Sequence, residues 1–146
     1  MGRILAIDYG KKRVGIAVTD ELQMIANGLK TVGSHELFPF LKDYISRETV
    51  DLFLVGEPKQ MDYTDSQANK YIEPFITKLK IEFPAIPVER MDERFTSKMA
   101  FQTMIDAGLN KKARQNKALV DTISATIILQ SYMESTAYKL RKEKNI

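Results

Sequence analysis

Apolar residues near the N-terminus gather in short runs rather than at helical spacing. Residues 3–9 and 13–20 each contain such a run, and a turn with a glycine and three basic residues separates them. Two apolar runs joined in this way predict a buried β-hairpin. Residues 26–32 predict a third strand, which would complete an antiparallel meander.

Helical and strand patterns alternate in the next part of the chain. Residues 34–48 carry apolar side chains at helical spacing, with Ser34 as the expected N-cap. Residues 51–56 and 86–93 are short apolar runs bounded by turn residues, so both predict strands. The strand at 51–56 is expected to run parallel to the N-terminal strand.

Three more helices are expected in the second half of the chain. The first spans about 66–84, where Pro74 is expected to disturb the helix. The second begins at residue 96 or 97 and ends near 107, before a glycine cap. The last runs from about 113 to beyond 132. Its segment 118–129 is apolar nearly all round, so it should be largely buried.

This order of elements predicts an α/β fold with a mixed five-stranded sheet and helices on both faces. Ligands in such sheets bind beyond the carboxyl ends of the parallel strands. The length of 146 residues fits one domain over residues 1–146, with a basic tail at about 136–146.

Composition narrows the possible chemistry. The chain has no cysteine, which excludes disulfides, thiolate nucleophiles and cysteine-based zinc sites. His35 is its one histidine, so a histidine-rich metal site is excluded as well. No apolar run approaches the ~18 residues that a bilayer span needs, and no leader pattern precedes the first strand. We therefore expect a cytoplasmic protein without a membrane partner. The net charge of +3 gives a mild bias toward polyanions.

Three acids stand where such a sheet would bind a ligand. Asp8 ends the first predicted strand, Glu93 ends the fifth, and Asp121 lies inside the most apolar helix. A carboxylate at the end of a buried strand is costly unless a cation or metal ion pairs with it. Carboxylate oxygens without histidine or cysteine suit Mg²⁺ or Mn²⁺. If the three acids converge, the chemistry they favour is metal-assisted phosphodiester hydrolysis.

Each acid also has a simpler explanation. Asp8 is able to cap the following turn by accepting from the amide of Gly10 or Lys11. Glu93 fits a surface cluster before a helix, where the helix dipole favours acids. Asp121 is able to pair with Lys117, one turn earlier on the same helix.

Basic residues form three clusters, at 11–13, 111–117 and 139–144. The first two flank the acids, whereas the third is interpreted as a solvated face. Gly10 and Gly56 are lone glycines and are interpreted as turn positions, since no P-loop spacing is present. The side chains expected to contact phosphates are Lys11, Lys12, Arg13, Arg94 and Lys117.

Four segments then carry a family resemblance in their order and spacing: residues 7–17, 55–62, 92–97 and 120–129. Together they resemble the bacterial YqgF/RuvX family of RNase H-like nucleases, over residues 3 to about 133. The resemblance implies an RNase H-like fold and metal-dependent catalysis by three acids, which match Asp8, Glu93 and Asp121. It also implies one of two roles, maturation of the 5′ end of 16S ribosomal RNA or Holliday-junction resolution.

One loop departs from the pattern of that family. The family usually has Val-Gly-Leu-Pro followed by Asn-Met-Asp-Gly-Thr, whereas Glu57, Gln60 and Tyr63 replace the leucine, the asparagine and the second glycine here. Glu57 is a candidate accessory metal ligand, because an acid on that strand serves the metal in other RNase H-like enzymes. The alternative is that Glu57 is a surface residue of a variable loop.

The sequence therefore favours a divalent-metal-dependent endonuclease that processes the 5′ end of precursor 16S ribosomal RNA. One alternative is a Holliday-junction resolvase acting on branched DNA, which needs a dimer because two cuts need two sites. A further alternative is a non-catalytic RNA-binding assembly factor. A monomer is favoured, because the apolar faces that can be identified are all needed to cover the sheet.

Overall fold

The structure is a computed structural model that describes residues 2–10, 12–57, 69–92, 117–134 and 139–140. These residues form a five-stranded sheet in the order β3-β2-β1-β4-β5. The strands are β1 (Arg3–Tyr9), β2 (Arg13–Thr19), β3 (Ala26–Gly33), β4 (Val50–Glu57) and β5 (Val88–Asp92). The first three strands pair antiparallel, and β4 and β5 run parallel to β1. The predicted mixed sheet is confirmed.

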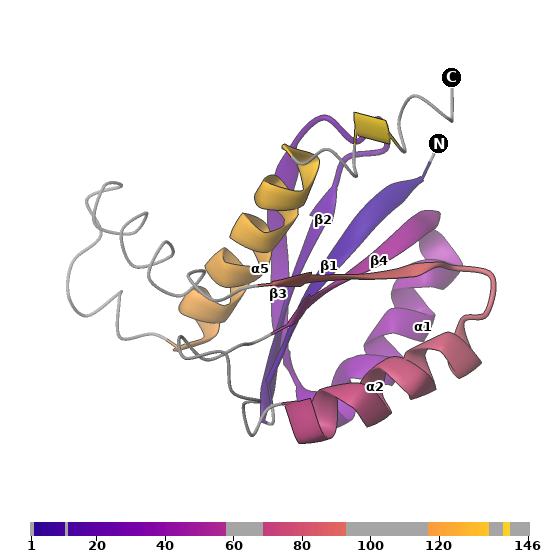
Figure 1. Cartoon of the computed structure of the whole chain (residues 1–146), viewed down its shortest axis with the longest axis vertical. Helices are drawn as coiled ribbons and strands as arrows, with labels where there is room; N and C mark the ends of the chain where they lie inside the picture. Colours follow the sequence, from indigo (N-terminus) through magenta and orange to yellow (C-terminus); the bar gives the residue numbers. More distant parts are fainter. Residues whose placement is uncertain (1, 11, 58–68, 93–116, 135–138, 141–146) are drawn as a thin grey trace.

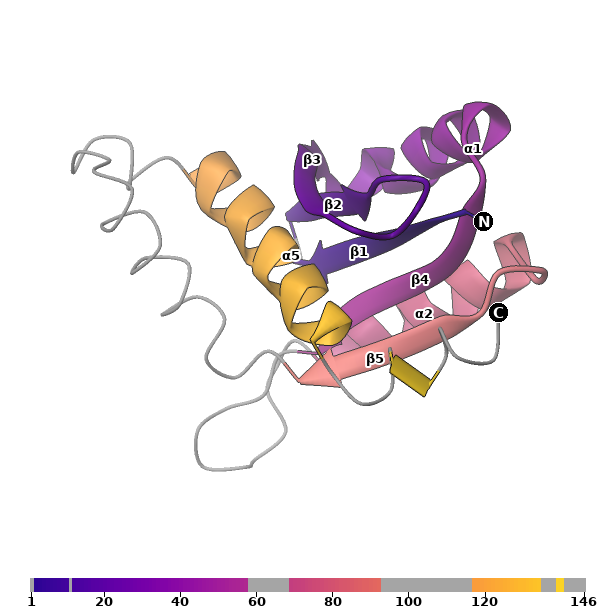
Figure 2. The same cartoon turned by 90° about the horizontal axis from the view of Figure 1, so that it is seen from above.

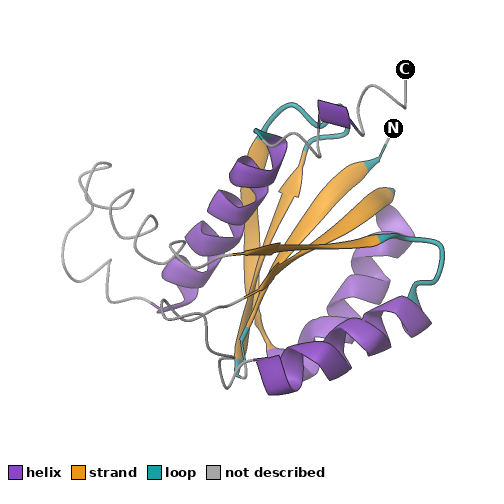
Figure 3. Ribbon diagram, in the orientation of Figure 1, coloured by secondary structure: helices purple, strands orange, loops and turns teal. Residues whose placement is uncertain are grey.

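Helices cover both faces of this sheet, as Figures 1 and 3 show. On one face lie the short 3₁₀ helix η1 (Ser34–Glu36) and the helices α1 (Leu37–Arg47) and α2 (Asn69–Glu82). On the other face lies α5 (Lys117–Met133), which crosses the strands at an angle in the view of Figure 2. None of the helices in the described ranges combines the length and the apolar character that crossing a membrane would require.

Alternate residues of β1 enter two separate cores. Leu5 and Ile7 pack into the core that α1 and α2 cover. Ile4 and Ala6 pack into the core that α5 covers. Because successive side chains of a strand point to opposite faces, β1 is buried on both sides. This burial explains why the N-terminal strand reads as a continuous apolar run instead of an alternating pattern.

Small residues beneath α5 allow that helix to lie directly on β2 and β3. A Cβ atom at Gly15 would lie 2.5 Å from the backbone carbonyl carbon of Asp121 and closer still to the oxygen. At Gly28 a Cβ atom would lie 2.6 Å from Cγ2 of Thr122. The hydroxyls of Thr31 and Thr122 are 2.7 Å apart and share a hydrogen bond across the same contact. Gly15 and Gly28 therefore allow α5 to lie close against β2 and β3.

The start of α1 differs from the prediction. Ser34 is not the N-cap: it opens η1, and α1 begins at Leu37 after Glu36, with no side-chain cap hydrogen bond. Pro39 is the third residue of α1 and has no backbone N–H. A capping side chain normally accepts from the second or third amide of a helix. One of those donors is missing here, so the advantage of a serine cap is reduced.

The strand predicted at 86–93 is described only over Val88–Asp92. Pro87 lacks an N–H and cannot donate to the sheet, although its carbonyl accepts from Phe53 N at 2.9 Å. Pro74 does lie inside α2, as expected. The start predicted for that helix at residue 66, and the helix predicted at 96–107, fall outside the described residues.

Candidate active site

Asp8 lies on the α5 side of the sheet near the carboxyl end of β1. Ile4 and Ala6, the preceding residues with the same orientation, belong to the core beneath α5, and strand alternation gives Asp8 that orientation too. Its partners in the neighbouring strands are Gly15 of β2 and Gly56 of β4. Neither partner carries a side chain, and the backbone of Asp121 lies directly above Gly15.

Gly56 is therefore a correction to the sequence analysis. It ends the strand predicted at 51–56 and is interpreted there as a turn position, but β4 continues to Glu57, and Gly56 is buried and pairs with both Asp8 and Met91. Gly15, on the other side of Asp8, is the second strand glycine of the site, and its missing side chain makes room for the backbone of Asp121. A glycine within an otherwise apolar strand run was the available signal for both positions.

Asp121 reaches this space from the second turn of α5. Its backbone carbonyl lies against Gly15, which is the strand partner of Asp8. The close approach of helix and sheet thus brings the two acids to the same end of the same face. The side chain of Asp121 is 22% exposed, so its carboxylate is partly shielded from water.

Arg13 forms an ion pair with Asp121. Its Nε donates to Oδ2 of Asp121 at 2.6 Å, and the Arg13 side chain is 41% exposed. Arg13 is the first residue of β2, so this cation comes from the basic turn that follows β1. Lys117, one turn earlier on the same helix, is the partner that the sequence offers for Asp121. The partner that the structure records is Arg13, because packing of α5 on β2 brings the two chain segments together.

A cavity of about 300 Å³ opens between these groups. Two carboxylates, two basic residues and one glycine line it: Asp8, Asp121, Lys12, Arg13 and Gly10. Carboxylates of this kind suit a hard divalent cation, and flanking Lys and Arg side chains suit phosphate oxygens. The cavity therefore has the chemical character of a site where a metal ion and a phosphate would meet.

The remaining predicted site residues are not placed by the structure. Glu93, Lys11 and Arg94 lie outside the described residues. Glu57 ends β4 and Lys117 begins α5, but the structure describes neither side chain. Convergence of all three acids therefore stays a prediction, and within the described ranges no group of three acidic or histidine side chains is placed to hold a metal.

The donor set that is described fits a divalent ion. Asp8 and Asp121 offer only carboxylate oxygens, which match the preference of Mg²⁺ and Mn²⁺. Through its ion pair with Asp121, Arg13 neutralises part of the negative charge that a bound metal ion would otherwise neutralise. Two acids facing one cavity would otherwise repel each other.

The sequence matches the family model named RuvX, described as Holliday junction resolvase, over residues 2–135. Among curated proteins it is 63% identical over 133 residues to a Flavobacterium psychrophilum protein named "Putative pre-16S rRNA nuclease", covering 91% of this chain and 97% of that protein. A Phocaeicola vulgatus protein of the same name is 60% identical over 138 residues, covering 94% and 99% of the two chains.

Solved structures of similar fold include RuvC of Thermus thermophilus. In complex with a Holliday junction substrate, RuvC superimposes with a TM-score of 0.54 at 16% identity, covering 92% of this chain and 97% of the RuvC chain. Another structure of Thermus thermophilus RuvC gives the same TM-score of 0.54 over 90% of this chain. At such low identity the likeness shows the fold, which is RNase H-like. The match of the family model over most of the sequence shows more: this chain belongs to the RuvX family of nucleases.

Proposed function

We propose that this nuclease is a divalent-metal-dependent endonuclease of the cytoplasm that processes the 5′ end of precursor 16S ribosomal RNA. The observation that carries the proposal is the cavity where Asp8 and Asp121 meet Lys12 and Arg13 at the carboxyl end of β1. Relatives about 60% identical over nearly their full length carry the name of a pre-16S rRNA nuclease, which supports the choice of substrate.

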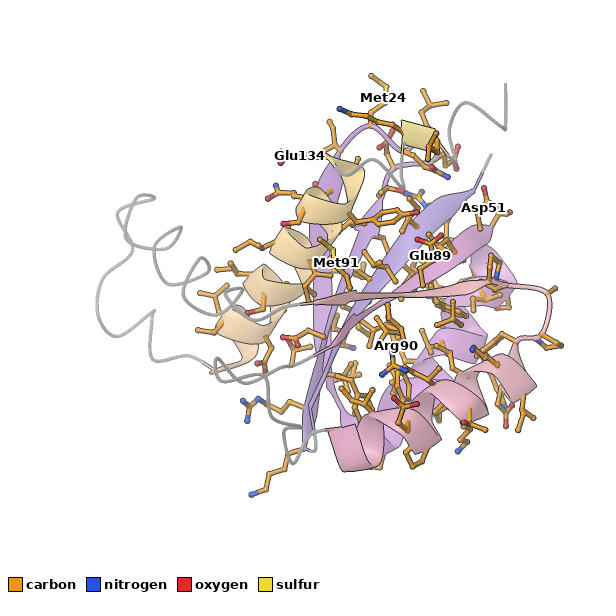
Figure 4. The ribbon with its side chains drawn as sticks, in the orientation of Figure 1. Met24, Asp51, Glu89, Arg90, Met91 and Glu134 are labelled. Atoms are coloured by element: carbon orange, nitrogen blue, oxygen red, sulfur yellow. The ribbon has the colours of Figure 1, made fainter. Side chains whose placement is uncertain are left out.

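Three acids hold the metal in this proposal: Asp8, Asp121 and Glu93. Figure 4 shows Glu89 and Met91 on the α5 side of β5, whereas Arg90 points toward α2. There Nη2 of Arg90 donates to Oε1 of Glu73 at 2.5 Å. We assign Glu93 as the third acid because it directly follows β5 in the sequence, and β5 runs parallel to β4 and so ends at the same edge of the sheet.

Glu57 would serve as an accessory ligand in the same site. A Mg²⁺ or Mn²⁺ ion bound there supplies Lewis-acid polarisation of the phosphodiester and activation of water. The protein itself supplies the geometry. Asp8 sits on a strand buried on both faces, and Asp121 sits on a helix that glycines hold close to that strand. Rigid elements of this kind hold ligands at fixed separations, which catalysis requires.

Basic side chains would bind the phosphates that flank the cut. Lys12 and Arg13 line the cavity; we assign the same role to Lys11, Arg94 and Lys117. Arg13 acts twice in this proposal: it balances Asp121 in the free protein and turns to a phosphate when substrate binds. An Arg guanidinium suits both partners because it donates in a planar fork.

Holliday-junction resolution is the second candidate function. The family model carries that description, and RuvC, which shares the fold, is solved with a junction substrate. A resolvase must cut two strands and therefore works as a dimer. We favour the RNA substrate and a monomer over residues 1–146, because trimming one RNA end needs a single active site.

The proposal is tested by incubating the purified protein with precursor 16S RNA and with four-way DNA junctions, with and without Mg²⁺ or Mn²⁺. We expect metal-dependent cleavage of the RNA at a defined position near the 5′ end. Solution mass is measured in parallel. A stable dimer that makes paired symmetric nicks in the junction and leaves precursor RNA intact would replace this proposal with the resolvase.

Arg13→Ala is expected to change metal binding and RNA binding in opposite directions. Loss of the 2.6 Å contact frees Asp121 for a metal ion, so affinity of the free protein for Mn²⁺ should rise. A charge-assisted hydrogen bond contributes about 1.5–3 kcal/mol. Because Arg13 is 41% exposed, we take the lower end, roughly a tenfold gain. RNA affinity measured without metal should fall.

Calorimetric titration with MnCl₂ and fluorescence anisotropy with labelled RNA measure the two effects. Arg47→Ala is the matched control, since Arg47 makes an exposed ion pair with Asp43 at 2.8 Å on α1. It should leave both affinities unchanged. Equal Mn²⁺ affinity in the Arg13→Ala variant and the wild type would show that Arg13 does not compete with the metal.

A further inference from the structure

A second cavity, of about 450 Å³, lies on the other side of the sheet, where the end of β1 meets η1, α1 and α2. Its volume falls within the range of about 300–1,000 Å³ that is usual for small-molecule sites. Aromatic rings and prolines form the walls, and polar side chains form the rim. The rings belong to Tyr9, Phe38 and Phe75, and the rim side chains are Ser34, His35 and Lys78.

The three rings form a connected aromatic surface. Tyr9 stacks on Phe75 with the ring centroids 4.2 Å apart and the planes at 12°. Phe38 meets Phe75 edge-on, with centroids 5.8 Å apart and planes at 62°. Phe75 is only 4% exposed and forms the floor. Tyr9 and Phe38 are partly exposed and form the walls above it.

The rim of this cavity carries a cation, Lys78, and a histidine, His35. Nζ of Lys78 lies 4.4 Å from the centroid of the Phe38 ring, and the side chain of His35 is 82% exposed. None of the described residues that line the cavity is acidic. Glu36 is the acidic neighbour of the rim, at 3.6 Å from Nε2 of His35. Aromatic walls beside a lysine suit a ligand with a flat ring and a phosphate, which describes a nucleotide.

We call this the aromatic cavity, and the cavity lined by Asp8 and Asp121 the acidic cavity. The two cavities border each other at the end of β1. Tyr9 follows Asp8 in β1, and their side chains point to opposite faces of the sheet. The backbone N–H of Ser34, on the rim, donates to the carbonyl of Lys12 at 3.0 Å. Lys12 itself lines the acidic cavity. A nucleic-acid strand passing over the end of β1 would therefore meet both cavities in succession.

We propose that the aromatic cavity binds one unpaired nucleobase of the substrate strand, close to the phosphate that is cut. The base stacks on the exposed parts of Tyr9 and Phe38, and a neighbouring phosphate contacts Lys78. The proposal rests on the proposed nuclease function of the acidic cavity. On this proposal the aromatic cavity recognises single-stranded nucleic acid, because a base-paired nucleobase cannot enter it. Stacking tolerates every base, so the cavity selects an unpaired position instead of a sequence.

The test compares two conservative variants with matched controls. Phe38→Leu removes a stacking ring, and Lys78→Gln removes the rim cation. Phe40→Leu is the control for the first, because Phe40 lies on α1 but stacks on Tyr44 at 6.0 Å, outside the cavity. Lys80→Gln is the control for the second, since Lys80 is exposed on α2 and does not line the cavity.

The probe is a labelled single-stranded RNA of about twelve nucleotides, within the usual range of site sizes. We expect Phe38→Leu to weaken its binding roughly five- to tenfold, because loss of one stacked base costs about that much. Lys78→Gln should weaken binding less and reduce its salt dependence. Both controls should bind like the wild type.

Abasic substitution at successive positions of the probe identifies the base. In the wild type, one position should show a loss similar to that of Phe38→Leu, and the variant should show no further loss there. If Phe38→Leu binds like Phe40→Leu while wild type still cleaves RNA, the aromatic cavity has no such role and the nuclease function stands. If binding depends on Phe38 but no metal-dependent cleavage occurs, the base site stands and the nuclease proposal falls.

Discussion

Replacing Asp8 by asparagine is expected to lower the cleavage rate on the order of a thousandfold or more, without unfolding the protein. Metal ions contribute several kcal/mol to phosphodiester hydrolysis, and each 1.36 kcal/mol is a factor of ten in rate. Asparagine keeps the shape of the side chain but loses the charge that holds a divalent ion. Single-turnover cleavage of precursor 16S RNA in Mg²⁺ measures the loss.

Thermal unfolding separates this effect from a structural one. Without metal, the Asp8→Asn variant should unfold at the wild-type temperature or slightly above it, because one of two acids facing the cavity has lost its charge. Asp43→Asn is the matched control, since Asp43 is exposed on α1 and pairs only with Arg47 in the described residues. It should cleave at the normal rate. Wild-type cleavage by Asp8→Asn would make Asp8 a structural residue.

The sheet was predictable because it is buried. β1 lies between two cores, so its apolar residues are consecutive, and the basic turn after it marks the hairpin. The parallel partner β4 shows the same uninterrupted run for the same reason. A strand that is buried on both faces appears in the sequence as a run of consecutive apolar residues. These runs, and their order along the chain, were enough to predict a mixed sheet with helices on both faces.

The position of Asp8 at the end of a strand could be predicted from the sequence, but the ion-pair partner of Asp121 could not. That partner, Arg13, lies on a strand, and the contact exists because α5 packs across β2. No local pattern encodes such a contact. Sequence periodicity places residues on a face of their own element, whereas an ion pair between elements depends on how closely the elements pack.

The structural roles of the glycines at the site were the hardest feature to predict from the sequence. Gly56 was assigned to a turn because an isolated glycine at the end of an apolar run usually marks one. It lies instead inside β4 beside Asp8. Glycine in a strand also marks a close approach of another group, and choosing between these explanations requires knowing what packs above the strand.

Gly15→Ala is expected to damage both stability and catalysis, because the added methyl would meet the backbone of α5. Its carbon would lie 2.5 Å from the carbonyl carbon of Asp121. Backbone cannot rotate away, so the whole helix must shift. Overpacking of this kind costs about 1–3 kcal/mol. Since Asp121 sits at the point of collision, a displacement of about 1 Å should also lower cleavage roughly a hundredfold. Urea unfolding and single-turnover cleavage measure the two losses.

Gly28→Ala distinguishes a general crowding effect from displacement of the acid. A methyl there would meet Cγ2 of Thr122 at 2.6 Å, which is a side-chain atom one residue beyond Asp121. The threonine can change its rotamer, at the cost of its hydrogen bond to Thr31, while the backbone of α5 stays in place. We therefore expect a smaller loss of stability and a cleavage rate within about tenfold of wild type. If the two variants lost stability equally but only Gly15→Ala lost activity, the carbonyl contact would be the feature that positions Asp121. Full activity in a folded Gly15→Ala protein would mean that α5 tolerates a shift, and that catalysis does not depend on a fixed position for Asp121.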